Sequence, residues 1–301
     1  MIELSIIIVN FNTKDFIKQC IASIIGSSFE REFEIIVVDN ASTDGSVEDI
    51  QKTTSLTQNF FLIENKENVG FSKANNQGIG VAKGSYFLFL NPDTVFSTDT
   101  LETVISFMEK HPDVGVATAR INLPNGTLDE ACHRGFPTPW NAFCYFSSLS
   151  KLCPKSKLFA GYQMGWLDLS TTHEVESVCG AFMMVSRQAG DQIGWGDEDY
   201  FWYGEDIDFC YRIKQKGLKI YYIPSASITH YKGVSGGIKQ ISKNIATASE
   251  TIKRNSMIAR FEAMRIFYKK HYKKRYPWFL TRLVFGAIGI LRFFNLYTLR
   301  K

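Results

Sequence analysis

The sequence lacks the cysteine spacings of a zinc or disulfide framework. Its six cysteines include no Cys-x-x-Cys pair, so we expect free thiols in a reducing cytosol. The start of the chain has no basic region before the short apolar run Ile6–Val9, so we expect no signal peptide there. The sequence also contains no internal repeat and no low-complexity tract, which leaves an ordinary globular protein as the expected class.

Acidic residues are scarce at the carboxyl-terminal end. Residues 253–301 hold 13 Lys/Arg and one Glu, so this end carries a formal charge of +12 and the rest of the chain −8, within the net charge of +4. The asymmetry predicts that the basic end meets an anionic surface. Nucleic acid is disfavoured as that surface, because the basic end is also apolar and the body of the protein is acidic.

The same end lacks a long uninterrupted apolar run. After Pro277 the uncharged apolar stretch is Leu283–Leu291, which is much shorter than the ~20 residues that a spanning helix needs. Trp and Phe side chains beside a dense Lys/Arg flank are typical of a segment that lies on anionic lipid. We favour that interpretation. The alternatives are a helix docked on the protein's own core and a true membrane span.

Strand and helix patterns alternate along most of the chain. Short apolar runs predict strands, and apolar residues at helical spacing predict helices between them. The predicted strands cover residues 5–9, 34–38, 59–63, 86–90, 114–118, 182–185, 219–223 and 228–230. The predicted helices cover residues 16–25, 72–83, 98–110, 206–216 and 249–271. This order indicates an α/β fold with a mostly parallel, Rossmann-like central sheet flanked by helices. Residues 121–178 have no clear period and are interrupted by prolines, so we expect a loop-rich insertion there.

Polar side chains follow successive predicted strands. Asn10 follows the first strand and Asp39 follows the second. The strand 86–90 stops at Asn91-Pro92-Asp93, because Pro92 cannot donate to a strand ladder. In a parallel sheet these ends meet at one edge, where ligands bind. A carboxylate such as Asp93 at this edge suits Mg²⁺ or Mn²⁺, although the triplet alone is also typical of a turn.

Two further motifs carry chemically useful groups. Gly204-Glu205-Asp206 directly precedes a predicted helix, so Asp206 is a candidate general base or a simple helix cap. Asp208 is a neighbouring carboxylate, but its offset of two places it on another side of the helix. His230 ends a short predicted strand before a Gly-rich stretch, and a neutral imidazole facing Asp93 would complete a cation site. A purely structural histidine is the alternative.

Together these motifs resemble the inverting glycosyltransferases of family 2, which have the GT-A fold. The resemblance covers about residues 4–235. Residues 10–12 resemble the loop that holds the donor nucleotide, residues 39–45 the segment whose first Asp contacts the base or ribose, and residues 68–78 the donor-binding loop and helix. Asn91-Pro92-Asp93 stands where the family has its Asp-x-Asp metal motif, and Gly204-Glu205-Asp206 matches the motif that ends in the catalytic base. His230 matches a late histidine that ligates the metal in some members.

The resemblance implies a role for each matching residue. Asp206 would be the catalytic base, and Asp93 with His230 would hold a divalent cation, Mg²⁺ or Mn²⁺. Trp202, within the aromatic cluster 200–203, and Glu205 would contact the acceptor, with core packing as the alternative for the aromatic cluster. The expected donor-binding residues are Val9, Asn10, Asp39, Asn68, Gly70, Asn75, Asn91 and Asp93.

The sequence departs from the family pattern at one position. The metal motif begins with Asn91 instead of Asp, which removes one negative charge. This variant resembles members that are rhamnosyltransferases using a deoxythymidine-diphosphate sugar. The late segments Arg254-Asn255 and 267–272 resemble the same subgroup, with less specific motifs.

The resemblance implies an enzyme that moves a sugar, with inversion, from a nucleotide-diphosphate donor such as dTDP-rhamnose to a hydroxyl of a lipid-linked saccharide. Such a reaction belongs to the synthesis of a cell-surface polysaccharide of the O-antigen or capsule type. The alternatives are a UDP-hexose donor and a non-catalytic sugar-nucleotide-binding scaffold, and the presence of Asp206 argues against the scaffold. A nucleotidyltransferase is disfavoured, because no Gly-rich phosphate loop with a basic residue follows the first strand.

The expected organisation is a catalytic domain and a tail. Residues 1–240 would form the GT-A domain, with a nucleotide-sugar-binding half (1–120) and an acceptor-binding, catalytic half (121–240). Residues 241–301 would form a helical, basic and hydrophobic tail that holds the enzyme on the cytoplasmic face of the membrane. No nucleic-acid partner is expected, and the sequence leaves a homo-oligomer open.

Overall fold

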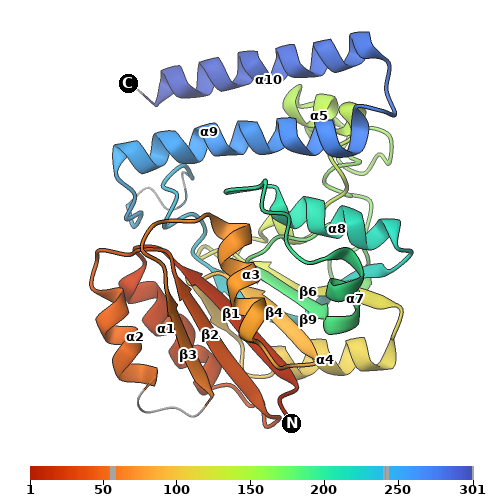
Figure 1. The fold of residues 1–301 in the computed structure, drawn as a ribbon. Coiled ribbons are helices and arrows are strands. Elements are labelled where there is room, and N and C mark those ends of the chain that lie inside the picture. Colours follow the sequence, from red (N-terminus) through yellow and green to blue (C-terminus); the bar gives the residue numbers. More distant parts are fainter. Residues whose placement is uncertain (55–58, 240, 242–243, 300–301) are drawn as a thin grey trace.

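Figure 1 shows the computed structural model, which describes residues 1–54, 59–239, 241 and 244–299. Within these residues the chain forms a nine-stranded mixed sheet with helices on its faces. The strands are β1 (Leu4–Asn10), β2 (Phe33–Asp39), β3 (Phe60–Glu64), β4 (Tyr86–Leu90), β5 (Thr94–Phe96), β6 (Val114–Asn122), β7 (His173–Glu174), β8 (Phe182–Ser186) and β9 (Lys219–His230). The expected α/β architecture, a central sheet flanked by helices, is therefore present, although the sheet is mixed rather than mostly parallel.

The helices connect and cover these strands. They are α1 (Lys14–Ile25), α2 (Ser46–Thr54), α3 (Phe71–Val81), α4 (Thr100–Lys110), α5 (Pro139–Phe146), α6 (Leu149–Leu152), α7 (Arg187–Ile193), α8 (Glu205–Gln215), α9 (Glu250–Phe267) and α10 (Trp278–Thr298). A 3₁₀ turn covers Glu130–Cys132, and a π-helical turn, Tyr268–Tyr272, continues α9. The sequence patterns did not reveal α2, α7 or the short elements within residues 121–178.

The sheet has a parallel half and a mixed half. Its order is β3-β2-β1-β4-β8-β6-β9-β5, with β7 paired to β9. Strands β1 to β4 are parallel neighbours, whereas β8 runs antiparallel to both β4 and β6. The carboxyl ends of β1, β2 and β4 therefore meet at one edge, where Asn10 pairs with Asp39 in the ladder.

One strand differs from its prediction. Residues 219–223 and 228–230 were expected to form two separate strands, but β9 is continuous from Lys219 to His230. It stays paired with β6 through a register shift between Ala119 and Arg120, which accommodates the irregular residues around Pro224. The far end of β9 pairs antiparallel with β5, and this places Thr94 opposite His230.

Buried aliphatic and aromatic side chains on both sheet faces form the core. All seven residues of β1 are buried, as a strand covered on both faces requires. Helix α3 packs on one face through Ala74, beside Val9 and Val38, and α1 and α4 contribute Ile17 and Val104 to the larger cluster. Each fully buried Val, Ile, Leu or Phe side chain of this core contributes about 1.5–3 kcal/mol when removed from water. The core thus fixes the strand ends that carry the polar residues.

The carboxyl-terminal helices dock on the body of the protein. Helices α9 and α10 lie antiparallel, one above the other, at the end of the molecule farthest from the N-terminus (Figure 1). Val284, Phe285 and Ile288 of α10 pack on Met257 and Phe261 of α9. The opposite face of α10 exposes Trp278, Phe279, Leu283, Ile290, Phe293, Phe294 and Tyr297. Helix α10 therefore docks on its own protein with one face and leaves an apolar face uncovered.

Helix α10 is longer than its uninterrupted apolar run. It extends over 21 residues, and an 18-residue window within it has a mean hydropathy of 1.5, so by length and composition alone it could cross a membrane. Such a helix is weak evidence for a span.

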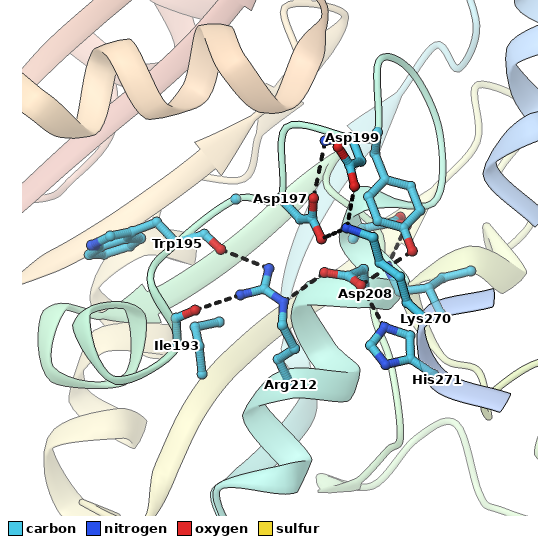
Figure 2. A network of polar contacts seen from close by, with 12 residues as sticks. Ile193, Trp195, Asp197, Asp199, Asp208, Arg212, Lys270 and His271 are labelled. Carbon is cyan, nitrogen blue, oxygen red and sulfur yellow. Dashed lines mark hydrogen bonds and ion pairs between the residues drawn. The ribbon is translucent and has the colours of Figure 1, made fainter. Parts of the chain in front are cut away.

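A buried carboxylate links the end of α9 to helix α8 (Figure 2). Asp208 is fully buried and accepts hydrogen bonds from His271 Nε2 at 2.6 Å, Arg212 Nε at 2.7 Å and the Tyr200 hydroxyl at 3.2 Å. Burial alone would raise the pKa of Asp208, but His271 and Arg212 hold it below its usual value. Asp208 is therefore a structural anion, which removes it as a competitor of Asp206 for the role of base.

The same contacts hold the loop that precedes α8. Arg212 donates to the main-chain carbonyls of Ile193 at 2.9 Å and Trp195 at 2.7 Å. Lys270 pairs with Asp197 and, at 2.7 Å, with Asp199. We call these contacts of Asp208, Arg212, Lys270 and His271 the latch, because they fasten the π-helical turn to α8 and to its preceding loop.

We expect the contacts of the latch to contribute measurably to the stability of the folded protein. His271→Ala leaves Asp208 Oδ1 with only the tyrosine hydroxyl, and an under-satisfied buried carboxylate costs about 1–3 kcal/mol. We expect the free energy of unfolding in urea to fall by that amount. Lys269→Ala, an exposed position in the same turn, is the control and should change the value by less than about 0.5 kcal/mol. Equal effects of the two substitutions would contradict the assignment.

Candidate active site

A cavity of about 240 Å³ opens at the carboxyl-terminal edge of the parallel strands. The predicted site residues that line it are Val9, Asn68, Gly70, Asn91, Asp93, Trp202, Glu205, Asp206 and His230. These residues come from the ends of β1, β4 and β9, the loop before α3 and the start of α8. The fold therefore brings together motifs that are separated by more than 200 residues in the chain.

Asp93 and His230 form one wall of the cavity. Asp93 Oδ1 lies 3.3 Å from His230 Nε2, and the amide nitrogen of Asn91 lies 3.4 Å from the same ring nitrogen. Both Asp93 and His230 are almost completely buried. The convergence follows from the β5–β9 ladder, in which Thr94, the residue after Asp93, pairs with His230.

The second ring nitrogen of His230 faces another carboxylate. Asp129 Oδ2 lies 3.4 Å from His230 Nδ1, and Asp129 also pairs with Lys232. Burial would lower the pKa of His230, but Asp93 and Asp129 together raise it to about 9. Burial would likewise raise the pKa of Asp129, yet His230 and Lys232 hold it well below its usual value. Sequence reasoning missed Asp129 and Lys232, which lie outside the recognised motifs.

The donor set of this wall fits a divalent cation. Carboxylate, imidazole and amide oxygen are ligands that Mg²⁺ or Mn²⁺ accepts, and a carboxylate behind the imidazole orients the ring, as is usual for metal-bound histidine. Among the described residues, no three or more His, Cys, Asp or Glu side chains converge as a preformed metal centre. Cation binding would displace the proton that the raised pKa gives His230, and Asp93 and His230 would then share the cation with oxygen atoms of a bound substrate.

Asp206 forms the other side of the site together with an arginine. Asp206 Oδ2 accepts a 2.6 Å hydrogen bond from Arg134, and its Oδ1 accepts from the main-chain N–H of Ile207 at 2.7 Å. Arg134 also donates to the carbonyl of Val178. Both charged side chains are nearly buried, with 13% and 11% of their side-chain surface exposed. Arg134 lies in the aperiodic stretch 121–178, where no sequence signal marked it.

Glu205 lies next to Asp206 and lines the same cavity. Its Oε2 is buried and has no hydrogen-bond partner within the described part of the chain. Burial and the charge of Asp206 raise the pKa of Glu205 to about 8. Glu205 therefore keeps its proton at neutral pH and can donate a hydrogen bond into the cavity.

The aromatic segment 200–203 divides between core and cavity. Tyr200 is buried and belongs to the hydrophobic cluster under the tail, so core packing accounts for it. The rings of Trp202 and Tyr203 stack 5.6 Å apart, and both residues line the cavity. Phe201 touches the donor-side loop, where Phe71 N–H donates to its carbonyl at 2.7 Å. A Cβ on Gly70 would come within 2.8 Å of Phe201, and the φ of +89° at Gly70 also requires glycine.

Three predicted donor-binding residues do not line the cavity. Asn10 is buried and donates to Asp39 Oδ2 at 2.6 Å, while the other oxygen of Asp39 accepts from the N–H of Ser42. Asn75 is also buried and donates to the carbonyl of Phe71. The cavity is lined instead by Asn40, which the sequence motifs did not single out. Direct donor contacts of Asn10, Asp39 and Asn75 stay predictions.

Comparison with known proteins identifies the family. The family model described as "Glycosyl transferase family 2" matches residues 5–194, more than half of the chain. The protein belongs to glycosyl transferase family 2. It is therefore a glycosyltransferase, as the motifs at the strand ends implied.

Two curated relatives of this glycosyltransferase are rhamnosyltransferases. One is N-acetylglucosaminyl-diphospho-decaprenol L-rhamnosyltransferase of Mycobacterium tuberculosis, 25% identical over 245 residues that cover 78% of each chain. The other is rhamnosyltransferase WbbL of Escherichia coli, 25% identical over 237 residues that cover 75% of this chain and 82% of the relative. These relatives agree with the subgroup resemblance of Asn91 and the late helix.

Solved structures confirm the GT-A fold of the glycosyltransferase. Mannosyltransferase PcManGT from Pyrobaculum calidifontis, in complex with GDP-Man and Mn²⁺, has a TM-score of 0.57 at 16% identity and covers 99% of this chain and 73% of its own. Staphylococcus aureus TarS 1-349 has a TM-score of 0.55 at 16% identity, with 90% and 74% covered. GalNAc-T7 with UDP, GalNAc and Mn²⁺ has a TM-score of 0.59 at 17% identity, but this chain spans only 44% of it. Two of these GT-A structures contain Mn²⁺, which points to divalent-cation use within the fold.

The raised pKa of Glu205 in this glycosyltransferase predicts a pH-dependent stability. Between its ordinary value of 4.5 and about 8, folded Glu205 keeps a proton that the unfolded chain releases, so stability falls as the pH rises through this window. Glu205→Gln removes the titration. We expect its Tm to equal that of the wild type near pH 5 and to exceed it by a few degrees at about pH 9.

Thermal unfolding across this pH range tests the prediction. Glu32→Gln, a substitution of an exposed glutamate directly before β2, is the control and should show no pH-dependent difference. If the Tm difference between Glu205→Gln and the wild type is the same at both pH values, the folded protein does not hold this proton.

Proposed function

We propose that this glycosyltransferase is an inverting enzyme that transfers a deoxysugar from a nucleotide-diphosphate donor, such as dTDP-rhamnose, to a hydroxyl of a lipid-linked saccharide. The observation that carries the proposal is the shared cavity, with Asp206 on one side and Asp93 with His230 on another. This arrangement provides a base for an acceptor hydroxyl and a place for a donor diphosphate. It supports direct displacement at the anomeric carbon.

In this proposal Asp206 removes the proton of the attacking hydroxyl. Arg134 fixes the orientation of the Asp206 carboxylate through the 2.6 Å contact. Attack from the side of Asp206, opposite the leaving diphosphate, inverts the configuration of the anomeric carbon. Protonated Glu205 and the ring of Trp202 would position the acceptor sugar beside this base.

The wall formed by Asp93 and His230 would receive the diphosphate. A Mg²⁺ or Mn²⁺ ion held by these two residues supplies charge neutralisation for the leaving diphosphate when it is bound. Asn91 contributes an uncharged amide where the family motif has a carboxylate, so Asp93 and His230 are the principal protein ligands. The buried side chains of Asn10 and Asp39 hold the loop after β2 through their hydrogen bonds with Ser42.

Two observations support a deoxysugar donor and a lipid-linked acceptor. Asn91 is the family variant that resembles rhamnosyltransferases, and both relatives described above are named as such. The name of the mycobacterial relative includes a diphospho-decaprenol acceptor. The second candidate is a UDP-hexose donor, because poly-beta-1,6-N-acetyl-D-glucosamine synthase of S. aureus is also 25% identical over 218 residues, although this chain spans 47% of it.

The tail is proposed to hold the enzyme on the cytoplasmic face of the membrane. The uncovered apolar face of α10 and the basic residues that precede this helix support the attachment. In this proposal residues 1–240 carry catalysis and residues 241–301 carry attachment. The latch joins the two regions through α8.

A donor panel tests the proposed activity. Release of nucleoside diphosphate is measured with dTDP-rhamnose, UDP-glucose, UDP-N-acetylglucosamine and GDP-mannose in the presence of Mn²⁺. We expect the highest kcat/KM with dTDP-rhamnose. Preference for a UDP-hexose would favour the second candidate, and no release with any donor would favour a non-catalytic scaffold.

Asp206→Asn should abolish transfer while it preserves donor binding. Loss of general-base catalysis lowers kcat by about 10²- to 10⁴-fold, because the amide cannot take the hydroxyl proton. The donor Kd, measured by calorimetry, should change by less than about twofold, since Asp206 acts on the acceptor side. Asp199→Asn, a largely exposed carboxylate before the same helix, is the matched control. If Asp206→Asn turns over at a rate close to that of the control, Asp206 is not the general base.

His230→Ala should weaken metal-dependent nucleotide binding. Loss of one of two protein ligands is expected to weaken nucleoside-diphosphate binding in Mn²⁺ by at least about 10- to 100-fold, with little change in its absence. His111→Ala, at the exposed end of α4, is the control. If His230→Ala and wild type gain the same affinity from added Mn²⁺, His230 does not belong to the cation site.

A further inference from the structure

A second apolar surface lies on the protein outside the tail. Five side chains of α5, α6 and the following loop are exposed: Trp140 (45%), Phe143 (55%), Phe146 (43%), Leu152 (77%) and Leu158 (60%). We call these five residues the α5–α6 patch. Isolated apolar side chains on a surface are ordinary, but several large ones on neighbouring elements mark an interaction site.

The α5–α6 patch is a fixed structure. The indole N–H of Trp140 donates to the main-chain carbonyl of Leu158 at 2.8 Å, which ties α5 to the loop after α6. The rings of Trp140 and Phe143 lie 5.7 Å apart. Helix α5 has a side-chain N-cap from Thr138 and anchors itself through Cys144, which is completely buried. The exposed side chains therefore sit on an anchored helix with defined ends.

The charged residues of the segment that carries the patch are all basic. The chain contains no Asp or Glu from residue 131 to residue 167. Lys151, Lys155 and Lys157 lie among the patch residues in sequence, and all three are exposed. Aromatic and aliphatic side chains beside lysines match the acyl boundary and the phosphate headgroups of an anionic bilayer. A symmetric contact between two copies would instead bring these lysines against each other.

The position of the patch in the fold also favours an anionic bilayer as its binding partner. Figure 1 shows α5 at the end of the molecule that carries α9 and α10, away from the N-terminus. The uncovered face of α10 is also free of acidic residues, because α10 contains Arg282 and Arg292 but no Asp or Glu. Two apolar, cationic elements that are distant in sequence therefore lie at one end of the protein.

The patch is also connected to the candidate active site. Helix α5 begins five residues after Arg134, which contacts the Asp206 carboxylate. Between them, Phe136 is held by a hydrogen bond from its N–H to Glu176, and the N–H of Gly135 donates to the carbonyl of Tyr162. A short, hydrogen-bonded segment thus joins the patch to the cavity wall.

We propose that the α5–α6 patch is a second membrane-binding surface, which inserts at the headgroup–acyl boundary of an anionic phospholipid bilayer. With α10 it makes a two-point attachment that sets the orientation of the cavity relative to the lipid surface. The proposal extends the attachment proposed for the tail. It does not depend on the identity of the donor or on the transfer reaction.

Vesicle flotation of the full-length protein tests the proposal. The probes are vesicles of phosphatidylglycerol with phosphatidylcholine, and vesicles of phosphatidylcholine alone. The triple variant Phe143→Asp/Leu152→Asp/Leu158→Asp should lower the partition coefficient on anionic vesicles by at least about tenfold. The matched control is Ile25→Asp/Phe61→Asp/Val81→Asp, which places the same charges at similarly exposed apolar positions and should retain the wild-type value within about twofold.

A second variant tests the charges without changing the apolar side chains. Lys151→Ser/Lys155→Ser/Lys157→Ser should weaken binding to anionic vesicles by about fivefold per lysine at low salt and leave binding to phosphatidylcholine unchanged. Its control is Lys18→Ser/Lys110→Ser/Lys216→Ser, which removes the same charge at other exposed sites. Tm and nucleoside-diphosphate release are measured on every preparation, so that misfolding and a failure of the catalytic proposal are recognised separately.

Three results would overturn the proposal. One is equal partitioning of the patch variants and their controls on anionic vesicles. Another is a patch variant that changes the molar mass of the protein in solution but not its vesicle binding, which would assign the patch to self-association. The third is wild-type protein that does not float with anionic vesicles, which would remove the tail attachment as well.

Discussion

The antiparallel pairing of β5 with β9 is the constraint on which the candidate site depends. The ladder sets Thr94 opposite His230 and so brings Asp93 and His230 together, although 137 residues separate them. Because β9 also pairs with β6 along most of its length, the position of His230 is fixed by the central sheet. The cation-binding wall is therefore a property of strand register, and a shift of one residue would turn His230 away from Asp93.

The opposite side of the site depends on helix α8 and its neighbours. Asp206 lies in the first turn of α8, where Arg134 orients its carboxylate, and Asp208 in the same helix is bound by the latch to His271. Two carboxylates of one helix thus have different roles, set by their partners. The latch also means that the tail is packed against the helix that carries the proposed base. The membrane-binding elements are therefore joined to the cavity: α9 and α10 through the latch to α8, and the α5–α6 patch through the segment that begins at Arg134.

Much of this could be predicted from the sequence, but some central contacts could not. The predicted strand 86–90 has the same bounds as β4, because its five apolar residues are followed directly by Asn91-Pro92. The family motifs predict Asp93, Asp206 and His230 as site residues, and the fold brings the three to one cavity, where their roles stay predictions. Pro224 divided the pattern of β9 into two parts, whereas main-chain pairing with β6 kept the strand whole. Arg134 and Asp129 lie in a segment without periodicity, and their roles arise from contacts with residues 72 and 101 positions away, so no local pattern could reveal them.

Direct displacement requires that Asp206 and the wall formed by Asp93 and His230 act from opposite sides of the anomeric carbon. The stereochemistry of the product tests this requirement most directly. With a donor that the enzyme accepts, the one-bond carbon–proton coupling at the anomeric centre of the product is measured by NMR and compared with that of the donor. A dTDP-β-L-rhamnose donor should give an α-linked product, which is inversion. A product that retains the β configuration would contradict direct displacement with Asp206 as the base.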